Sequence, residues 1–161
     1  MTRAQAMAIL ETVKDPEVPV ISVVELGIVR EVSVHPEGVQ VTITPTYSGC
    51  PAMHEIEADV RAALVKAGAP AVTVSMVHAP AWTTDWIGPE AREKLRAYGI
   101  APPSKAAPPG LITLTRARTP VPCPFCGSRE TRLQSEFGST ACKAIHVCQS
   151  CRQPFDEFKP F

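Results

Sequence analysis

Cys123-Pro124-Phe125-Cys126 and Cys148-Gln149-Ser150-Cys151 are the two stretches that decide the fold of the C-terminal part of this chain. Each stretch, here called a hook, has two residues between its cysteines, which allows a tight turn that points both sulfurs at one centre. Four such thiolates can surround a tetrahedral zinc ion at about 2.3 Å. With 21 residues between the hooks, the spacing predicts a β-rich zinc ribbon with one metal held by Cys123, Cys126, Cys148 and Cys151.

The ribbon contains further candidate ligands besides the four cysteines of the hooks. Thiolates also hold iron-sulfur clusters, so the bound group is left open between zinc and a cluster. Cys142 lies in a small-residue stretch that we predict to be a loop, and it can approach the metal, carry a persulfide, contact a partner or be an inert buried thiol. His146 is predicted to be a strand residue, because four cysteines already complete a tetrahedron.

Composition and charge restrict the classes of protein to which the chain can belong. The first residues, Met1 to Met7, lack the apolar core of a signal peptide, so we expect a cytoplasmic protein with reduced thiols. No apolar run approaches the roughly 18 to 20 residues that cross a bilayer. Residues 1–110 carry 9 basic and 12 acidic side chains and residues 111–161 carry 7 and 4. This near-neutral balance argues against nucleic-acid binding.

A proline-rich stretch divides the chain. Residues 102–124 hold seven of the 17 prolines, and such a segment forms neither a helix nor a central strand. We therefore predict an α+β protein with an N-terminal domain at 1–100, a linker at 101–110 and the four-cysteine ribbon at 111–161.

The N-terminal domain shows alternating helix and strand patterns. Val32 to Ile43 alternates apolar and polar residues on both sides of Pro36-Glu37-Gly38, which is typical of a β-hairpin. Residues 72–76 have the pattern of a further strand. Helical spacing or helix start and stop signals predict three helices, which are expected at residues 4–13, from Pro51 to just before Gly68, and at 89–98.

Cys50 lies where the hairpin gives way to the second predicted helix, in Thr46-Tyr47-Ser48-Gly49-Cys50-Pro51. Its sulfur is expected to face the unpaired amides at the helix start, where a thiol ionises more easily and becomes a better nucleophile and metal ligand. A small apolar cap over the core is an equally good interpretation of Cys50. His54, four residues later, is interpreted as a solvated helix residue. Core packing is expected for at least one of Trp82 and Trp86.

Three motifs of the N-terminal domain resemble those of SufT-type iron-sulfur assembly factors. They are Asp15-Pro16-Glu17-Val18-Pro19, Glu25-Leu26-Gly27-Ile28-Val29 and Thr46-Tyr47-Ser48-Gly49-Cys50-Pro51. The resemblance implies that Cys50 is a functional thiol that transiently handles iron or an iron-sulfur cluster, with Asp15 at the same end of the fold. A carboxylate that caps its own loop is the alternative for Asp15.

The whole chain resembles the PaaD family, also called PaaJ. The resemblance rests on Pro80-Ala81-Trp82-Thr83-Thr84-Asp85-Trp86-Ile87, on Tyr98 to Pro103, and on the ribbon from Cys123 to Lys159. It implies an accessory subunit that matures the multicomponent phenylacetyl-CoA 1,2-epoxidase, with the di-iron oxygenase or the flavin/iron-sulfur reductase as partner. The alternative is a structural or adaptor subunit whose zinc only folds the ribbon, and homodimerisation is left open. The sequence contains no Ser-His-Asp arrangement or nucleotide-binding loop, so we predict no catalytic residue.

Overall fold

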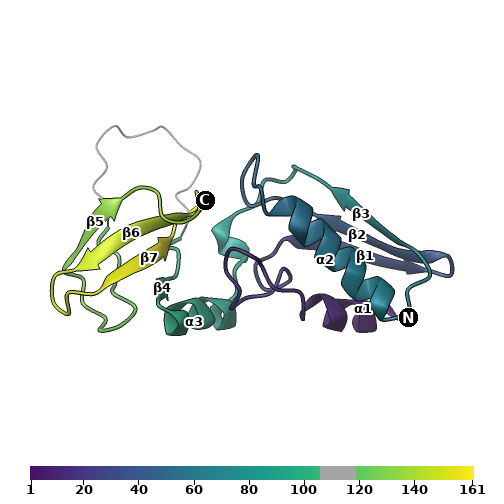
Figure 1. Cartoon of the computed structure of the whole chain (residues 1–161), viewed down its shortest axis with the longest axis horizontal. Helices are drawn as coiled ribbons and strands as arrows, with labels where there is room; N and C mark the ends of the chain where they lie inside the picture. Colours follow the sequence, from purple (N-terminus) through teal and green to yellow (C-terminus); the bar gives the residue numbers. More distant parts are fainter. Residues whose placement is uncertain (106–118) are drawn as a thin grey trace. The chain divides into compact units, whose positions relative to one another are not determined.

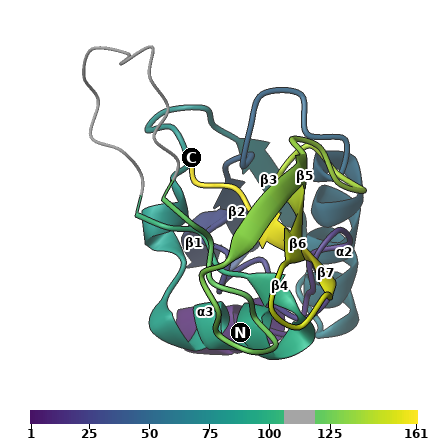
Figure 2. The ribbon, with the colours of Figure 1, turned by 90° about the vertical axis from the view of Figure 1, so that its left-hand side faces the viewer.

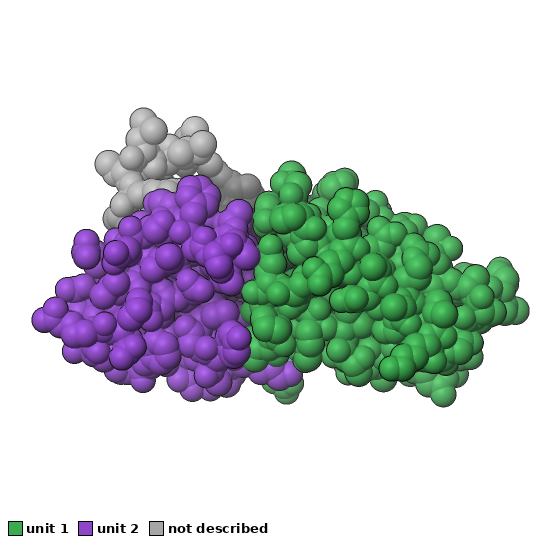
Figure 3. Space-filling view, in the orientation of Figure 1, with its two compact units in different colours: residues 1–91 green, residues 92–161 purple. Residues whose placement is uncertain are grey.

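The computed structural model of the chain describes residues 1–105 and 119–161. The chain divides into two compact units, Met1–Ala91 and Arg92–Phe161, which are coloured separately in Figure 3. We name them the N-terminal unit and the ribbon unit. Each unit contains a β-sheet of its own, and helices accompany the sheets (Figure 1). The predicted α+β fold class is confirmed.

The N-terminal unit packs two helices on a three-stranded sheet. The sheet order is β1-β2-β3, with β1 and β2 antiparallel and β2 and β3 parallel. Helix α1 contacts β1, α2 contacts β3, and the two helices contact each other, so both lie on the same face of the sheet (Figure 1). The elements are α1 (Arg3–Leu10), β1 (Val29–His35), β2 (Gly38–Ile43), α2 (Met53–Lys66), β3 (Val72–Met76) and a 3-10 turn, η1 (Thr84–Trp86).

The hairpin forms where the alternation predicts it. Val39, Val41 and Ile43 of β2 point into the core, with at most 3% of each residue exposed. Across the antiparallel ladder Val41 pairs with Val32, so apolar side chains meet on one face. The parallel ladder with β3 then closes a β2-α2-β3 crossover, which fixes the turn between β2 and α2 that contains Cys50.

Two helix boundaries differ from the prediction by more than one residue. Helix α1 begins at a Thr2 capping box but ends at Leu10, not at Val13, and the Thr12 hydroxyl donates to the Ile9 carbonyl at 2.7 Å just after its last turn. Side chains of this kind compete with the helix for backbone groups. Helix α2 begins at Met53 and not at Pro51, because Pro51 and the following alanine form a turn ahead of it. The buried side of α2 consists of Met53, Ile56, Val60 and Leu64.

The ribbon unit is built on a four-stranded sheet of order β4-β7-β6-β5 (Figure 2). Strand β4 runs parallel to β7, and the other neighbours are antiparallel. Helix α3 (Pro89–Tyr98) crosses the division between the units and ends just before Gly99, as predicted. The strands are β4 (Ile100–Ala101), β5 (Thr131–Ser135), β6 (Lys143–Cys148) and β7 (Pro154–Phe158).

The division between the units differs from the predicted domain limits. The ribbon unit begins at Arg92, and Ala101, which the sequence places in the linker, pairs with Glu157 in the ribbon sheet. A strand of two residues has no periodicity from which it can be predicted. Residues 106–110 of the predicted linker and 111–118 of the predicted ribbon lie outside the described residues. Within the described residues, no helix combines the length and the hydrophobicity that a membrane span requires.

Candidate metal centre

The two hooks share one backbone construction. The residue after the second cysteine, Gly127 or Arg152, donates its N–H to the carbonyl of the first cysteine at 2.9 Å or 3.1 Å. Both residues adopt a left-handed backbone, with φ of 75° at Gly127 and 66° at Arg152. Glycine adopts this conformation freely, whereas a residue with a Cβ is strained there. The second hook therefore keeps its turn in spite of an unfavourable residue.

The four hook sulfurs converge on one point. Cys123 Sγ lies 3.7 Å from Cys151 Sγ, and Cys126 Sγ lies 3.6 Å from Cys148 Sγ. All four sulfurs lie within 4.8 Å of one another. A tetrahedron with metal–sulfur bonds of about 2.3 Å has edges of about 3.8 Å, whereas a disulfide needs about 2.05 Å. The four thiols are free and fit one tetrahedral metal ion.

Proton affinities inside this cluster are uneven. The pKa of Cys148 is lowered to about 6, first because the backbone N–H of Cys151 donates to its sulfur. The pKa of Cys151 is raised to about 12: a backbone hydrogen bond from Gln153 lowers it, but burial and the neighbouring sulfurs outweigh that bond. Negative charges this close repel each other, so a cation is needed before all four sulfurs can ionise together.

A hydrogen-bonded clip joins the two hooks outside the sulfur cluster. The N–H of Glu130 donates to Ser128 Oγ at 3.1 Å, and the Ser150 hydroxyl donates to Glu130 Oε2 at 3.1 Å. Ser128 Oγ lies 2.8 Å from Ser150 Oγ, and because the Ser150 proton goes to Glu130, Ser128 is the donor between them. The backbone N–H of Gln149 also donates to the Glu130 carbonyl at 2.7 Å. Sequence reasoning missed this clip, because no recognisable spacing relates Ser128 and Glu130, which follow the first hook, to Ser150 inside the second.

Cys142 and His146 lie outside the group of four sulfurs. Cys142 is 3% exposed, it lies in the predicted loop, and its sulfur is 3.0 Å from Thr140 Oγ1. His146 is a buried β6 residue, as predicted. Its Nε2 lies 2.8 Å from Glu157 Oε2, and its ring stacks on Phe155 with 5.5 Å between centroids. No sequence pattern indicates this buried His-Glu pair, since its partners are 11 residues apart on neighbouring strands.

Cys50 occupies the turn predicted for it, between β2 and α2. The residue is half-buried, its N–H donates to the Tyr47 carbonyl at 3.3 Å, and its own carbonyl accepts from Met53 at 3.4 Å. Among the described residues, the hook cysteines form the only group of three or more side chains arranged to hold a metal. Cys50 and Asp15 therefore belong to no preformed three-ligand site, and their role in cluster handling stays a prediction.

Asp15 caps its own loop. It is 5% exposed, and its Oδ1 accepts hydrogen bonds from the N–H groups of Glu17 and Val18, both at 2.8 Å. These bonds shape the Asp15-Pro16-Glu17 turn. The structure thus shows Asp15 as a carboxylate that caps its own loop.

Two other motifs of the N-terminal unit pack together. Trp82 is buried, and its Nε1–H donates to the Leu26 carbonyl at 2.9 Å. Gly27 has φ of 77°, and a Cβ there would lie 3.0 Å from Cβ of Trp86. The Arg30 guanidinium lies 3.6 Å from the centre of the Trp86 ring. The expected core role is confirmed for Trp82.

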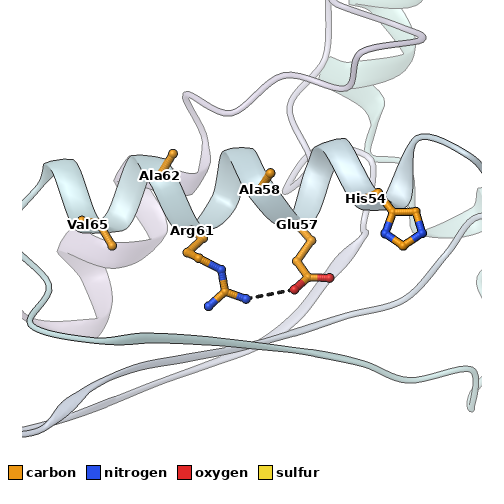
Figure 4. Close-up of a pocket in the computed structure, with 6 residues that line it drawn as sticks. All are labelled: His54, Glu57, Ala58, Arg61, Ala62 and Val65. Atoms are coloured by element: carbon orange, nitrogen blue, oxygen red, sulfur yellow. Dashed lines mark hydrogen bonds and ion pairs between the residues drawn. The ribbon is translucent and has the colours of Figure 1, made fainter.

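An open pocket of about 540 Å³ lies along the exposed side of α2 (Figure 4). Exposed His54 lines one end and Val65 lies at the other. Glu57 and Arg61 are paired at 2.9 Å, and Arg61 also donates to the Val72 carbonyl. Arg61 therefore links α2 to β3, and Glu57 is its partner on the helix. His54 is the solvated helix residue that the sequence predicts.

Two family models match this chain, one in its N-terminal part and one in its C-terminal part. The model of a PaaD zinc beta ribbon domain matches residues 107–159, and that of an iron-sulfur cluster assembly protein matches residues 3–76. A protein of Escherichia coli K12 that is named as a putative 1,2-phenylacetyl-CoA epoxidase subunit is 48% identical over 152 residues, which cover 94% of this chain and 89% of the relative. The chain belongs to the PaaD family.

Other relatives match a smaller share of this PaaD family member. An Fe-S protein maturation auxiliary factor of Porphyromonas gingivalis is 36% identical over 58% of this chain and 90% of its own length. The crystal structure of a domain of unknown function from Bacillus anthracis matches with a TM-score of 0.54 and 29% identity, covering 57% of this chain and 89% of that one. A conserved hypothetical protein of Thermotoga maritima matches with a TM-score of 0.51 and 32% identity over 59% and 94%.

Proposed function

We propose that this chain is an accessory subunit of a phenylacetyl-CoA epoxidase that assists iron or iron-sulfur cluster assembly in the oxygenase or the reductase. The observation that carries the proposal is the joint match: one chain contains an iron-sulfur assembly domain and a PaaD ribbon, and it is 48% identical to a relative named as an epoxidase subunit. The relative named as an Fe-S maturation factor matches 58% of this chain and supports the assembly role.

Cys50 is the residue proposed to handle the metal or cluster. A single half-buried thiol in a turn offers one soft ligand while leaving room for ligands from another molecule. Incomplete coordination suits a group that must be handed on, because a client can complete the ligand set and then keep it. The cluster or iron ion is cargo in this role and not a resident cofactor.

Zinc is the metal proposed for the ribbon. Its four thiolates form a closed tetrahedral set without a vacant position, which is typical of structural zinc. Zinc bound there would fold the ribbon, and the ribbon would present the chain to its partner subunits. The same protein thus combines a closed metal site with an open thiol.

The alternative function is an adaptor or structural subunit of the epoxidase. The loop-capping bonds of Asp15 favour it, because they give a structural reason for this residue without any metal chemistry. An adaptor acts at fixed stoichiometry with its partners, whereas a maturation factor can act at substoichiometric levels.

The test is the metal content of the epoxidase components purified from cells that lack this protein. We expect soluble oxygenase or reductase polypeptides that are deficient in iron or iron-sulfur cluster and that chemical reconstitution partly repairs. Fully metallated components that become active only when stoichiometric amounts of this protein are added would instead establish the adaptor function.

A further inference from the structure

The four ligand sulfurs of the ribbon differ in their exposure to solvent. The first cysteine of each hook is buried, with 3% of Cys123 and 0% of Cys148 exposed. The second cysteine is more accessible: Cys151 is half-buried and Cys126 is exposed. The candidate metal site therefore has a buried edge and a solvent edge, and Cys126 is the most accessible of its ligands.

Packing explains this difference. Cys123 and Cys148 form an apolar cluster with Ala101 and Phe155, and Cys151 packs against the same cluster. Three of the four ligands are thus held by the core of the ribbon unit. Cys126 is held by the turn of its own hook, in which Gly127 bonds back to the Cys123 carbonyl.

Thiolate-bound metal ions are transferred when an incoming thiolate replaces a bound one, and the rate depends on access to the bound sulfur. A sealed four-sulfur site gives an attacking thiol no route, whereas the solvent edge at Cys126 provides one. We propose that Cys126 is the replaceable ligand of this centre, and that the ribbon exchanges its metal with thiol-bearing acceptors through it.

The exchange step balances without an oxidant. The acceptor sulfur forms a bond to the metal, the bond to Cys126 Sγ breaks, and the proton of the acceptor thiol goes to Cys126. Cys123, Cys148 and Cys151 stay in place, since the apolar cluster and the Ser128-Ser150-Glu130 clip hold both hooks. This inference concerns the ribbon alone and does not depend on the role proposed for Cys50.

The first test measures thiol alkylation in the folded, zinc-loaded full chain. The protein is treated with a limiting amount of iodoacetamide, and modification of each cysteine is followed by peptide mass spectrometry alongside zinc release. We expect Cys126 to be the first hook cysteine modified, and zinc to leave in step with its modification. Cys142, a buried thiol outside the group of four, serves as the internal standard for a protected cysteine. Modification of Cys123 or Cys148 at the rate of Cys126 would overturn the proposal.

The second test measures zinc release to a chromogenic chelator in the presence of glutathione. A tenfold rise in glutathione is expected to give about a tenfold rise in the release rate, because the thiol takes part in the step. A release rate that does not depend on glutathione would show that the metal dissociates without an acceptor, and would contradict the exchange.

Two histidine variants test, by zinc content at equilibrium, whether Cys126 can be replaced as a ligand more easily than Cys148. Cys126→His is expected to retain one equivalent of zinc, because an imidazole is also a zinc ligand and the exposed position has room for the ring. Cys148→His places the ring in a fully buried position and is expected to lose the zinc. Equal retention or equal loss in the two variants would show that Cys126 is not the replaceable ligand.

Discussion

The two units of the molecule are stabilised in different ways. Among the twelve largest fully buried side chains of the described residues, only Leu95 and Phe158 belong to the ribbon unit. The N-terminal unit has a conventional apolar core, whereas the ribbon unit combines a small core with four converging sulfurs and a buried His-Glu pair. We therefore expect the folding of the ribbon unit to require its four hook thiols, and the folding of the N-terminal unit to be insensitive to Cys50.

Removing one ligand from the ribbon should produce the largest effect. Cys123→Ser is expected to release the metal and unfold the ribbon unit, because metal binding in small four-ligand modules contributes about 10 to 16 kcal/mol. Elemental analysis measures the loss of metal, and amide hydrogen exchange of β6 measures the unfolding.

The N-terminal unit provides the internal control for this variant. Trp82 and Trp86 are the only tryptophans of the chain and both lie in that unit, so their fluorescence should be unchanged. Cys142→Ser, which removes a ribbon thiol outside the group of four, should retain the metal. A folded, fully loaded ribbon in Cys123→Ser would contradict the four-sulfur assignment.

The buried pair of the ribbon unit should have the next largest effect. His146→Ala leaves the Glu157 carboxyl group, whose side chain is 10% exposed, without its hydrogen-bond partner, and leaving a buried polar group unsatisfied costs about 1 to 3 kcal/mol. The change in unfolding free energy of the ribbon unit is measured by denaturant unfolding, with amide hydrogen exchange of β6 as the signal. Glu93→Gln, which breaks the exposed Glu93-Arg96 pair, is the matched control, and we expect no measurable loss from it. Equal effects of the two variants would show that burial does not strengthen the His-Glu contribution.

Substitutions in the two hook turns should have smaller effects, one destabilising the ribbon and the other stabilising it. Gly127→Ala is expected to destabilise the metal-bound ribbon by about 1 kcal/mol, because alanine is strained at a φ of 75°. Arg152→Gly should relieve the corresponding strain at 66° and stabilise it by a similar amount. Among the described residues other than Gly127 and its two chain neighbours, no atom lies within 4 Å of a Cβ built on Gly127, so we expect the backbone conformation to determine the result. The measurement is the denaturant midpoint of metal release, and shifts of the same sign would contradict the equivalence of the hooks.

Cys50→Ser should have the smallest effect on stability and still abolish the proposed function. Serine is nearly isosteric with cysteine but lacks the soft thiolate, so the unfolding free energy should change by less than about 0.5 kcal/mol. Cells with this variant should produce epoxidase components as poor in iron as cells without the protein, while Cys142→Ser supports normal maturation. Growth on phenylacetate equal to that of the parent, at matched expression, would remove Cys50 from the mechanism.

The parts of this structure that the sequence predicts are those that local spacing encodes. The hooks can be predicted because two residues between the cysteines set the turn. The hairpin can be predicted because Val39, Val41 and Ile43 alternate with polar residues. The clip and the His146-Glu157 pair could not be predicted, because they join residues on different segments that have no common pattern. Asp15 is the intermediate case: the sequence allows loop capping as one of two roles, and the hydrogen bonds that establish it are visible only in the structure.

Strand β4 limits how the ribbon can be moved between proteins. Its two residues come before the proline-rich segment, yet they pair with β7 and complete the edge of the ribbon sheet. A ribbon cut out at residue 111 would leave that edge of β7 open, and open edges attract other chains. A ribbon module transferred to another protein should therefore begin at helix α3, well before its first cysteine, so that β4 still covers this edge.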